Sequence, residues 1–311
     1  MVDLNSKNFD SIALIGFGEA GQAFVEGWHK AGYAGETFAF DIKTLSKSQS
    51  IVDAKMADYE KFNVTGCKSA KEAVAVGAAV FSLVTADKAF EAASEAAKFI
   101  RKGTFFFDCN SCAPGSKRKS AALIEAAGGR YVDTAVMAPV HPKLHQTPLL
   151  IAGPHSIDAV AYLNNILAMS SKQVEGDVGA ASSIKMIRSV IMKGLEAVIL
   201  ESVLAGRRAG VDDIVLDSME QTYPGFGWKK RAAYMMERAA THGIRRSAEM
   251  REVANTVREL GFSGSMSDAA ADWEQMIGEL RLDMSLVDNE DHGAVAETLL
   301  APLNKQMKHT G

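Results

Sequence analysis

Short apolar runs alternate with helical patterns through the first half of the chain, and this alternation constrains the fold more than any other feature. The runs typical of strands lie at residues 11–17, 36–41, 63–67, 78–85, 104–108, 130–138 and 148–153. The segments typical of helices lie between them, at residues 19–32, 48–62, 69–77, 87–103 and 114–129. Because parallel strands must be joined by a crossover, usually a helix, this order predicts a doubly wound, mainly parallel α/β sheet of the Rossmann type.

The second half of the chain has a different pattern. A helical pattern runs without a break from about Val178 to about Arg208, which corresponds to about 45 Å of helix. Only helical segments and short loops follow it. We therefore predict a Rossmann domain at residues 1–176 and an all-helical domain, led by this long helix, at residues 177–311.

Composition and charge exclude several classes of function. The formal net charge of −4 provides no electrostatic basis for binding nucleic acid or an acidic membrane surface. No stretch reaches the roughly 18 apolar residues of a membrane span, and residues 1–10 lack the pattern of a secretory signal. The chain has only three cysteines, which fits a reducing compartment rather than a disulfide scaffold, so we expect a cytoplasmic protein.

A glycine-rich loop connects the first predicted strand to the first predicted helix. Gly16, Gly18 and Gly21 form the pattern G-x-G-x-x-G, and the positions between them are Phe17, Glu19 and Ala20. Asp41 follows Gly21 by twenty residues, at the end of the next strand. In dinucleotide-binding proteins the first glycine permits a tight turn, the second lets the backbone approach the pyrophosphate, and the third allows close packing of helix on strand. The N–H groups at the helix start would then face the phosphates.

Asp41 also bears on the choice of cofactor. A carboxylate at this position accepts hydrogen bonds from the ribose hydroxyls of NAD and repels the 2′-phosphate of NADP. Lys43, two residues later, softens this preference. We predict NAD as the cofactor, with NADP as the alternative. Val84 and Thr85 follow another strand, and we expect them to line the same ligand-binding edge of the sheet.

The start of the long helix carries a lysine in an unusual place. An apolar stripe follows one face of this helix and consists of Ile184, Ile187, Ile191, Leu195 and Val198. Lys185 lies on a neighbouring face, and Ser189 and Met192 follow it at spacings of four and three. A cation in the first turns of a helix is not placed for stability, because it faces the positive end of the helix dipole. The spacing alone still favours an ordinary lysine that extends into water.

Three motifs occur in an order that resembles the β-hydroxyacid dehydrogenases of the 6-phosphogluconate dehydrogenase superfamily. They are the glycine loop, the stretch VDTAVMAPVHP at residues 132–142, and GAASSIKMIRS at residues 179–189. A Rossmann domain followed by an all-helical domain with a long leading helix is also the layout of that family. Residues 242–261 resemble a poorly characterised branch whose second domain is known as a domain of unknown function.

The resemblance implies an NAD(P)-dependent oxidoreductase that moves a hydride between nicotinamide and a small β-hydroxy acid or its carbonyl partner. Lys185 corresponds to the general acid/base of that family, which takes or returns the hydroxyl proton. The residues that would orient the substrate are Asn110, Ser111, Arg188 and Ser189. The helical domain of such proteins usually packs on a partner copy, which implies a homodimer.

The chain departs from the family pattern at several positions. Ser189 stands where family members usually have an asparagine, and the Ser-Gly-Gly substrate loop is replaced by Met137, Ala138 and Pro139. Arg245 and Arg246 align with a Lys-Asp pair, and we expect Met137, Ala138 and Arg245 still to contact the substrate. Met192 replaces the glutamate that 6-phosphogluconate dehydrogenases use as a second acid, so we reject phosphogluconate as the substrate. The retained Lys185 argues against an imine reductase, in which this lysine is commonly replaced.

Two other interpretations stay open. Cys109 and Cys112 form a C-x-x-C pair at a strand end, which motivates a thiol oxidoreductase. A redox dithiol usually opens a helix, however, and a structural zinc site needs about four ligands, so we expect small apolar cysteines and no metal site. The altered substrate loop motivates the second alternative, a dinucleotide-binding sensor or scaffold without catalysis.

Overall fold

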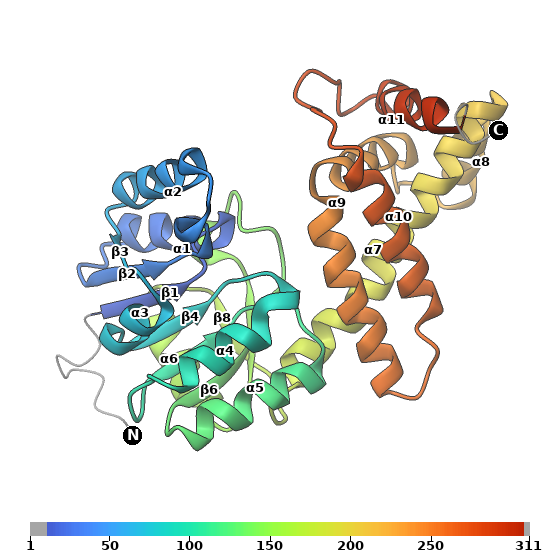
Figure 1. The fold of residues 1–311 in the computed structure, drawn as a ribbon. Coiled ribbons are helices and arrows are strands. Elements are labelled where there is room, and N and C mark those ends of the chain that lie inside the picture. Colours follow the sequence, from blue (N-terminus) through green and yellow to red (C-terminus); the bar gives the residue numbers. More distant parts are fainter. Residues whose placement is uncertain (1–10, 308–311) are drawn as a thin grey trace. The chain divides into compact units, whose positions relative to one another are not determined.

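The computed structural model describes residues 11–307 (Figure 1). The chain divides into two compact units, residues 1–186 and residues 187–311, and each is described separately. Helix α7 (Ala180–Ala209) begins in the first unit and ends in the second. The expectation about a secretory signal concerns residues 1–10, which lie outside the described residues.

The first unit is built on an eight-stranded sheet in the order β3-β2-β1-β4-β5-β6-β7-β8. Its strands are β1 (Ser11–Ile15), β2 (Glu36–Phe40), β3 (Thr65–Gly66), β4 (Ala79–Ser82), β5 (Phe105–Asp108), β6 (Arg130–Val136), β7 (Leu149–Ala152) and β8 (Ser171–Gln173). Neighbouring strands are parallel except β6 and β7, which are antiparallel. The predicted doubly wound, mainly parallel sheet is confirmed.

Helices cover both faces of this sheet (Figure 1). They are α1 (Glu19–Lys30), α2 (Gln49–Lys61), α3 (Ala70–Val76), α4 (Ala89–Ala97), α5 (Pro114–Ala126) and α6 (Ser156–Asn165). Helices α1, α2 and α6 bury apolar side chains on one face, in a core that includes Trp28 and Phe107. Helices α3, α4 and α5 pack on the other face, with Phe106 and Tyr131. Because consecutive strand residues point to opposite faces, a strand buried on both sides reads as one continuous apolar run.

The structure differs from the prediction mainly at strand ends and after β7. The strand predicted at residues 78–85 ends at Ser82, because the backbone N–H of Val84 donates to the side chain of Asn110 instead of to a neighbouring strand. Helix α6 and strand β8 are missing from the sequence prediction. Helix α6 begins after His155 without a side-chain cap, and β8 has only three residues, so neither has a strong local signal.

The described part of the second unit contains only helices and loops, as predicted. After α7 come α8 (Asp212–Thr222), α9 (Trp228–Glu259), α10 (Ser265–Glu279) and α11 (His292–Met307). Helices α9 and α10 touch backbone to backbone at Gly243 and Gly278. A Cβ on Gly243 would lie 2.2 Å from the carbonyl oxygen of Glu274 and 2.9 Å from Cα of Gly278, so this crossing requires glycine.

Most of the apolar stripe of α7 does not face the core of the second unit, although Leu195 packs against that core. Ile187, Ile191 and Val198 are exposed by 48%, 71% and 52%. The helix instead contributes Leu200 and Leu204, with their neighbours, to the core. The periodicity therefore identifies the helix correctly but not the side that it buries within one chain.

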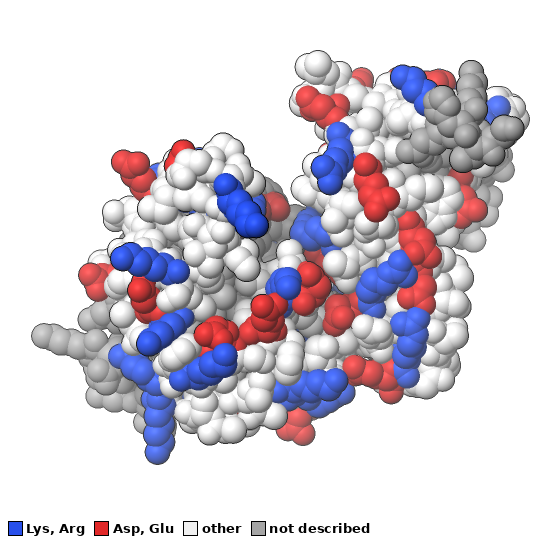
Figure 2. Space-filling view, viewed as in Figure 1, with Lys and Arg blue, Asp and Glu red and all other residues white. Residues whose placement is uncertain are grey.

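The outer surface carries charges of both signs. Lysine, arginine, aspartate and glutamate side chains are interspersed on the face of the molecule that Figure 2 shows. Within residues 11–307, no helix combines the length and the apolar character needed to cross a membrane. Both observations agree with the ordinary charge balance of the sequence.

Candidate functional site

The glycine loop makes a tight turn between β1 and α1. Gly16 has a φ of +91°, and a Cβ added to it would lie 2.5 Å from the carbonyl oxygen of Leu83. Its N–H donates to the carbonyl oxygen of Phe40 at 2.8 Å, which ties the loop to the end of β2. Only glycine combines this left-handed conformation with such a close backbone neighbour.

Gly18 and Gly21 have different surroundings from Gly16. Gly18 is exposed, and a Cβ added to it would meet nothing within 4 Å. Gly21 is buried, and its added Cβ would lie 3.1 Å from the carbonyl oxygen of Gly16 and 3.3 Å from the Phe17 ring. The three glycines thus occupy a turn, an open surface at the start of α1 and a close helix–strand contact. The first N–H groups of α1 and the open space over Gly18 fit the phosphates of a dinucleotide.

Asp41 fixes the shape of this loop. Its carboxylate is buried and accepts hydrogen bonds from the N–H of Phe17 at 2.8 Å and the N–H of Lys43 at 2.9 Å. The ring of Phe17 is buried 5.3 Å from that of Tyr59, so the predicted role of Phe17 at the loop is limited to its backbone. The side chain of Glu19 is exposed and that of Ala20 is half-buried, at the start of α1.

A buried lysine that the sequence analysis missed supports the same loop. Lys55 on α2 donates from Nζ to the carbonyl oxygen of Phe17 at 2.6 Å and pairs with Asp58 at 2.6 Å. Gln22 on α1 also donates to Asp58, at 3.0 Å. The loop is therefore held from both sides, by Asp41 and by Lys55. No sequence signal indicates this role, because α2 has a mostly polar pattern.

Val84, Thr85 and Asn110 lie where β4 and β5 end. Val84 is close to the glycine loop, 3.2 Å from a Cβ added to Gly16, and Thr85 is exposed. Asn110 is buried, and its Oδ1 accepts from the N–H of Val84 at 2.7 Å. Its Nδ2 donates to Ser82 at 2.9 Å and to Asp108 at 2.8 Å. The amide of Asn110 thus joins the two strand ends, and its contact with substrate stays a prediction.

The structure brings Lys185 to Ser111. Nζ of Lys185, in the second turn of α7, donates to Oγ of Ser111 at 2.6 Å. Ser111 is half-buried in the loop that follows β5. Sheets of this type bind ligands beyond the carboxyl ends of their strands, and this loop lies at that edge. An amine and a hydroxyl in hydrogen-bond contact there form a pair able to exchange a proton with a bound hydroxyl group.

A buried cluster of charged residues lies where β5 ends beside the middle of β6. Asp108 and Asp133 are register partners on these strands, and Nζ of Lys117 lies 3.1 Å and 3.7 Å from their Oδ1 atoms. The Tyr131 hydroxyl donates to Asp108 at 2.7 Å. Burial by itself lowers the pKa of Lys117, but the two carboxylates outweigh it and hold that pKa above its ordinary value. Lys117 lies in the basic run GSKRKS at residues 115–120, yet its side chain is fully buried, whereas the side chains in such runs are usually solvated.

The remaining predicted substrate residues are distributed over both units. Met137 is half-buried after β6, where its N–H donates to the carbonyl oxygen of Pro148, and Ala138 is exposed. In the second unit, Arg188 is exposed and Ser189 is buried. Arg245 donates to Glu249 at 2.6 Å. The neighbouring Arg246 is buried in an ion-pair cluster with Glu196 and Glu274, so it is not an exposed basic position.

The two cysteines after β5 lack the character of a redox pair. Both are buried, and burial raises the pKa of Cys109 to about 12, so its reactive thiolate is scarce at neutral pH. Pro114 begins α5 after both of them, which leaves neither cysteine at the helix start. These observations favour the apolar role over the thiol oxidoreductase.

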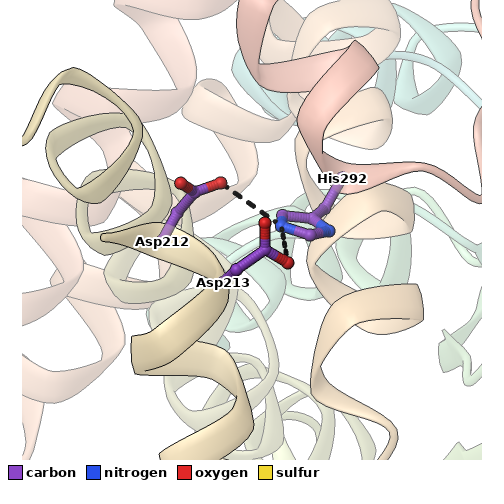
Figure 3. Close-up of side chains that lie close together, drawn as sticks. All are labelled: Asp212, Asp213 and His292. Carbon is purple, nitrogen blue, oxygen red and sulfur yellow. Dashed lines mark ion pairs between the residues drawn. The ribbon is translucent and has the colours of Figure 1, made fainter. Parts of the chain in front are cut away.

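One group of potential metal ligands in the second unit lies at the starts of α8 and α11. Nε2 of His292 lies 3.3 Å from Asp212 and 3.7 Å from Asp213, and the ring points toward both carboxylates (Figure 3). The same carboxylate oxygens also pair with Arg207 at 3.3 Å and Lys229 at 2.9 Å. Two cations already balance these carboxylates, so the arrangement is that of an ion-pair network that joins the two helix starts.

Comparison with known proteins agrees with this description. Residues 11–179 match the NAD binding domain of 6-phosphogluconate dehydrogenase, and residues 207–277 match a domain of unknown function, DUF1932. A conserved hypothetical protein from Sinorhizobium meliloti 1021 is 33% identical, with a TM-score of 0.70 over 94% of this chain and 96% of that chain.

Two further solved structures are similar along their whole length. MTH1747, a conserved protein of unknown function described as structurally similar to 3-hydroxyacid dehydrogenases, is 25% identical, with a TM-score of 0.62 over 88% of this chain and 100% of that chain. A 3-hydroxyisobutyrate dehydrogenase from Mycobacterium tuberculosis has a TM-score of 0.67 at 17% identity, over 94% of this chain and 100% of that chain. These findings confirm the resemblance expected from the motifs. The chain carries an NAD(P)-binding domain and belongs to the family defined by the NAD binding domain of 6-phosphogluconate dehydrogenase.

Proposed function

We propose that this chain is an NAD-dependent dehydrogenase or reductase that transfers a hydride between nicotinamide and a small β-hydroxy acid or its carbonyl partner. The observation that carries the proposal is the 2.6 Å hydrogen bond from Lys185 to Ser111 in the first unit. It holds an amine beside the loop after β5, in a domain whose family binds NAD(P).

Lys185 is the proposed general acid/base. In the oxidation direction its neutral Nζ takes the hydroxyl proton of the substrate, and in the reduction direction its ammonium returns that proton. A free lysine has a pKa of about 10.4, so the base form requires burial or a neighbouring cation. Bound nicotinamide supplies the donor or acceptor of the hydride.

The proposed substrate class rests on the motifs around Lys185 and on the character of the relatives. The Mycobacterium tuberculosis protein is described as a 3-hydroxyisobutyrate dehydrogenase with L-serine, and both compounds are small β-hydroxy acids. For this chain we propose that Ser111 contacts the substrate, together with Met137, Ala138, Arg188, Ser189 and Arg245. We propose that Asn110 fixes the position of the neighbouring Ser111, because the amide of Asn110 is hydrogen-bonded to other residues of the protein.

For the cofactor we propose that Asp41 favours NAD over NADP. Changing Asp41 to asparagine is expected to shift the ratio of kcat/KM values toward NADP by about 10- to 100-fold. The neutral amide removes a charge repulsion of about 1–3 kcal/mol against the 2′-phosphate. Steady-state kinetics with both cofactors measures the shift.

The matched control is Glu36→Gln. Glu36 is exposed at the first residue of β2, whereas Asp41 follows the last one, so the control removes the same charge at the opposite end of the strand. An unchanged cofactor preference in Asp41→Asn, or an equal shift in the control, would contradict the role of Asp41.

We propose three further features of this chain: a homodimer, a cytoplasmic location and a domain boundary. A homodimer would cover the exposed Ile187, Ile191 and Val198 of α7. A cytoplasmic location fits the three free thiols. A domain boundary at residues 176 and 177 falls between the end of β8 at Gln173 and the start of α7 at Ala180.

A substrate panel tests the proposal directly. Purified protein is mixed with small β-hydroxy acids, α-hydroxy acids or their carbonyl partners, with NAD(H) and with NADP(H), and nicotinamide absorbance is followed. We expect turnover on at least one β-hydroxy acid or its carbonyl partner, with NAD preferred. Tight NAD binding without turnover on any compound would instead support the dinucleotide-binding sensor or scaffold.

A further inference from the structure

The buried cluster of Asp108, Asp133 and Lys117 contains a lysine with no exposed surface. The side chain of Lys117 is 0% exposed, and its Nζ donates to the carbonyl oxygen of Asp108 at 2.5 Å. It also lies near the carboxylates of Asp108 and Asp133, which occupy neighbouring strands side by side. Burying a lysine is costly unless it is paired, so a buried lysine that no proposed chemical step uses needs a physical reason.

Asp108 connects Lys117 to the loop that carries Ser111. Oδ1 of Asp108 accepts from the N–H of Asn110 at 3.1 Å and from its Nδ2 at 2.8 Å. These bonds fix the chain just before Ser111. The Tyr131 hydroxyl occupies the other oxygen of Asp108, so the carboxylate cannot rotate without losing a buried partner.

Asp133 connects Lys117 to the start of α7, the helix that carries Lys185. Oδ2 of Asp133 accepts from the N–H of Gly179 at 3.0 Å, the N–H of Ser182 at 3.1 Å and Oγ of Ser182 at 3.2 Å. Asp133 therefore caps the start of α7, where a carboxylate is also favoured by the helix dipole. Lys185 follows Ser182 by three residues on the same side of the helix.

We propose that Lys117 is a positioning residue, whose buried ammonium joins Asp108 to Asp133 and so fixes both members of the Lys185–Ser111 hydrogen bond. One carboxylate sets the loop that carries Ser111, and the other sets the helix end that carries Lys185. Without the cation, two adjacent buried carboxylates repel each other, and the loop and helix start that they hold shift apart. The catalytic part of this inference rests on the proposed function, whereas the structural coupling does not.

The test compares Lys117→Met with Lys119→Met. Methionine has a similar length without the charge, and Lys119 is an exposed residue of the same helix, α5. Hydrogen exchange of residues 179–186 reports the order of the α7 start without any need for substrate. We expect exchange in this segment to speed up by about tenfold or more in Lys117→Met and to be unchanged in Lys119→Met. Unchanged exchange in Lys117→Met would overturn the proposal.

Kinetics provide a readout that a general loss of stability does not reproduce. In Lys117→Met we expect kcat to fall by about 10- to 100-fold, because small displacements of reacting groups are costly, while KM for the dinucleotide is unchanged. Combined with Ser111→Ala, the loss should not exceed that of the more damaging single variant, since both changes act through one hydrogen bond. Losses that multiply, or a kcat equal to wild type, would contradict the positioning role.

A second variant covers the case in which Lys117→Met does not fold. Lys117→Met with Asp133→Asn removes one buried carboxylate together with the cation, and the asparagine oxygen still accepts from the α7 start. Asp108 keeps its donors from Tyr131 and Asn110. The reference for this double variant is Asp133→Asn alone, which changes the cap but keeps the cation. We expect exchange at residues 179–186 to be faster and kcat to be lower in the double variant than in Asp133→Asn, because the ammonium that joins the two strands is gone, and equal values would overturn the proposal. If wild type turns over no substrate, the proposed function fails, and the exchange result alone decides whether Lys117 couples the two elements.

Discussion

Replacing Lys185 with methionine is expected to lower kcat by about 10²- to 10⁴-fold while dinucleotide binding persists. Methionine fills a similar volume but can neither take nor return a proton, and general acid/base catalysis contributes a factor of this size. The Nζ of Lys185 donates to Ser111 in the loop after β5, whereas the proposed phosphate contacts lie at the glycine loop, so the cofactor contacts should survive. Nicotinamide absorbance measures turnover, and the fluorescence of bound reduced cofactor measures affinity.

Lys172→Met is the matched control for this prediction. Lys172 is an exposed residue of β8 in the same unit, so the same chemical change there should leave kcat at the wild-type level. A Lys185→Met protein with nearly full activity would exclude this lysine as the acid/base. A parallel loss of cofactor binding would show instead that the substitution had disturbed the domain as a whole.

Changing Gly18 to valine is expected to weaken dinucleotide binding by about 100-fold or more without lowering the thermal unfolding midpoint. Gly18 has an ordinary φ of −88°, and a Cβ added there meets no protein atom within 4 Å, so the folded protein tolerates a side chain. A valine would occupy the space above the start of α1 that a pyrophosphate requires. Calorimetric titration with NAD and a thermal melt of the same sample test both parts.

Gly16→Ala provides the contrast for Gly18→Val. Its φ of +91° and the carbonyl oxygen 2.5 Å from the added Cβ make alanine strained at this position, so this variant should lose stability as well as binding. Both variants should bind NAD more weakly, but only Gly16→Ala should also unfold at a lower temperature. NAD affinity equal to wild type in Gly18→Val would show that the loop does not hold the cofactor.

The strand–helix order and the glycine loop could be predicted because they depend on local rules. Alternating apolar runs specify the sheet, and Gly16, Gly18 and Gly21 are spaced by the geometry of one turn and one helix start. The contact between Lys185 and Ser111 spans 74 positions, so spacing alone does not predict it. The family resemblance identified both residues, and the structure brings them together.

Lys117 was missed because charge runs are usually solvated, although its position carried a signal. Pro114, Lys117, Ala121 and Ile124 are buried at helical spacing, so Lys117 lies on the inner stripe of α5. A lysine on that stripe, opposite strands that contain Asp108 and Asp133, indicates an internal ion pair. On α7, by contrast, most of an apolar stripe is exposed within one chain, because periodicity does not say which partner covers a face.

Asp41 has two roles at once: it is proposed to select the cofactor, and it holds the glycine loop in its conformation. One side chain accepts the N–H groups of Phe17 and Lys43, and the same side chain is proposed to select the ribose. Under the proposed function, a mutation that altered cofactor use at this position would also release at least one of these backbone N–H groups. An evolutionary route from one nicotinamide to the other would therefore pass through a loosened intermediate, and a protein engineer would need a new acceptor for those groups before changing residue 41.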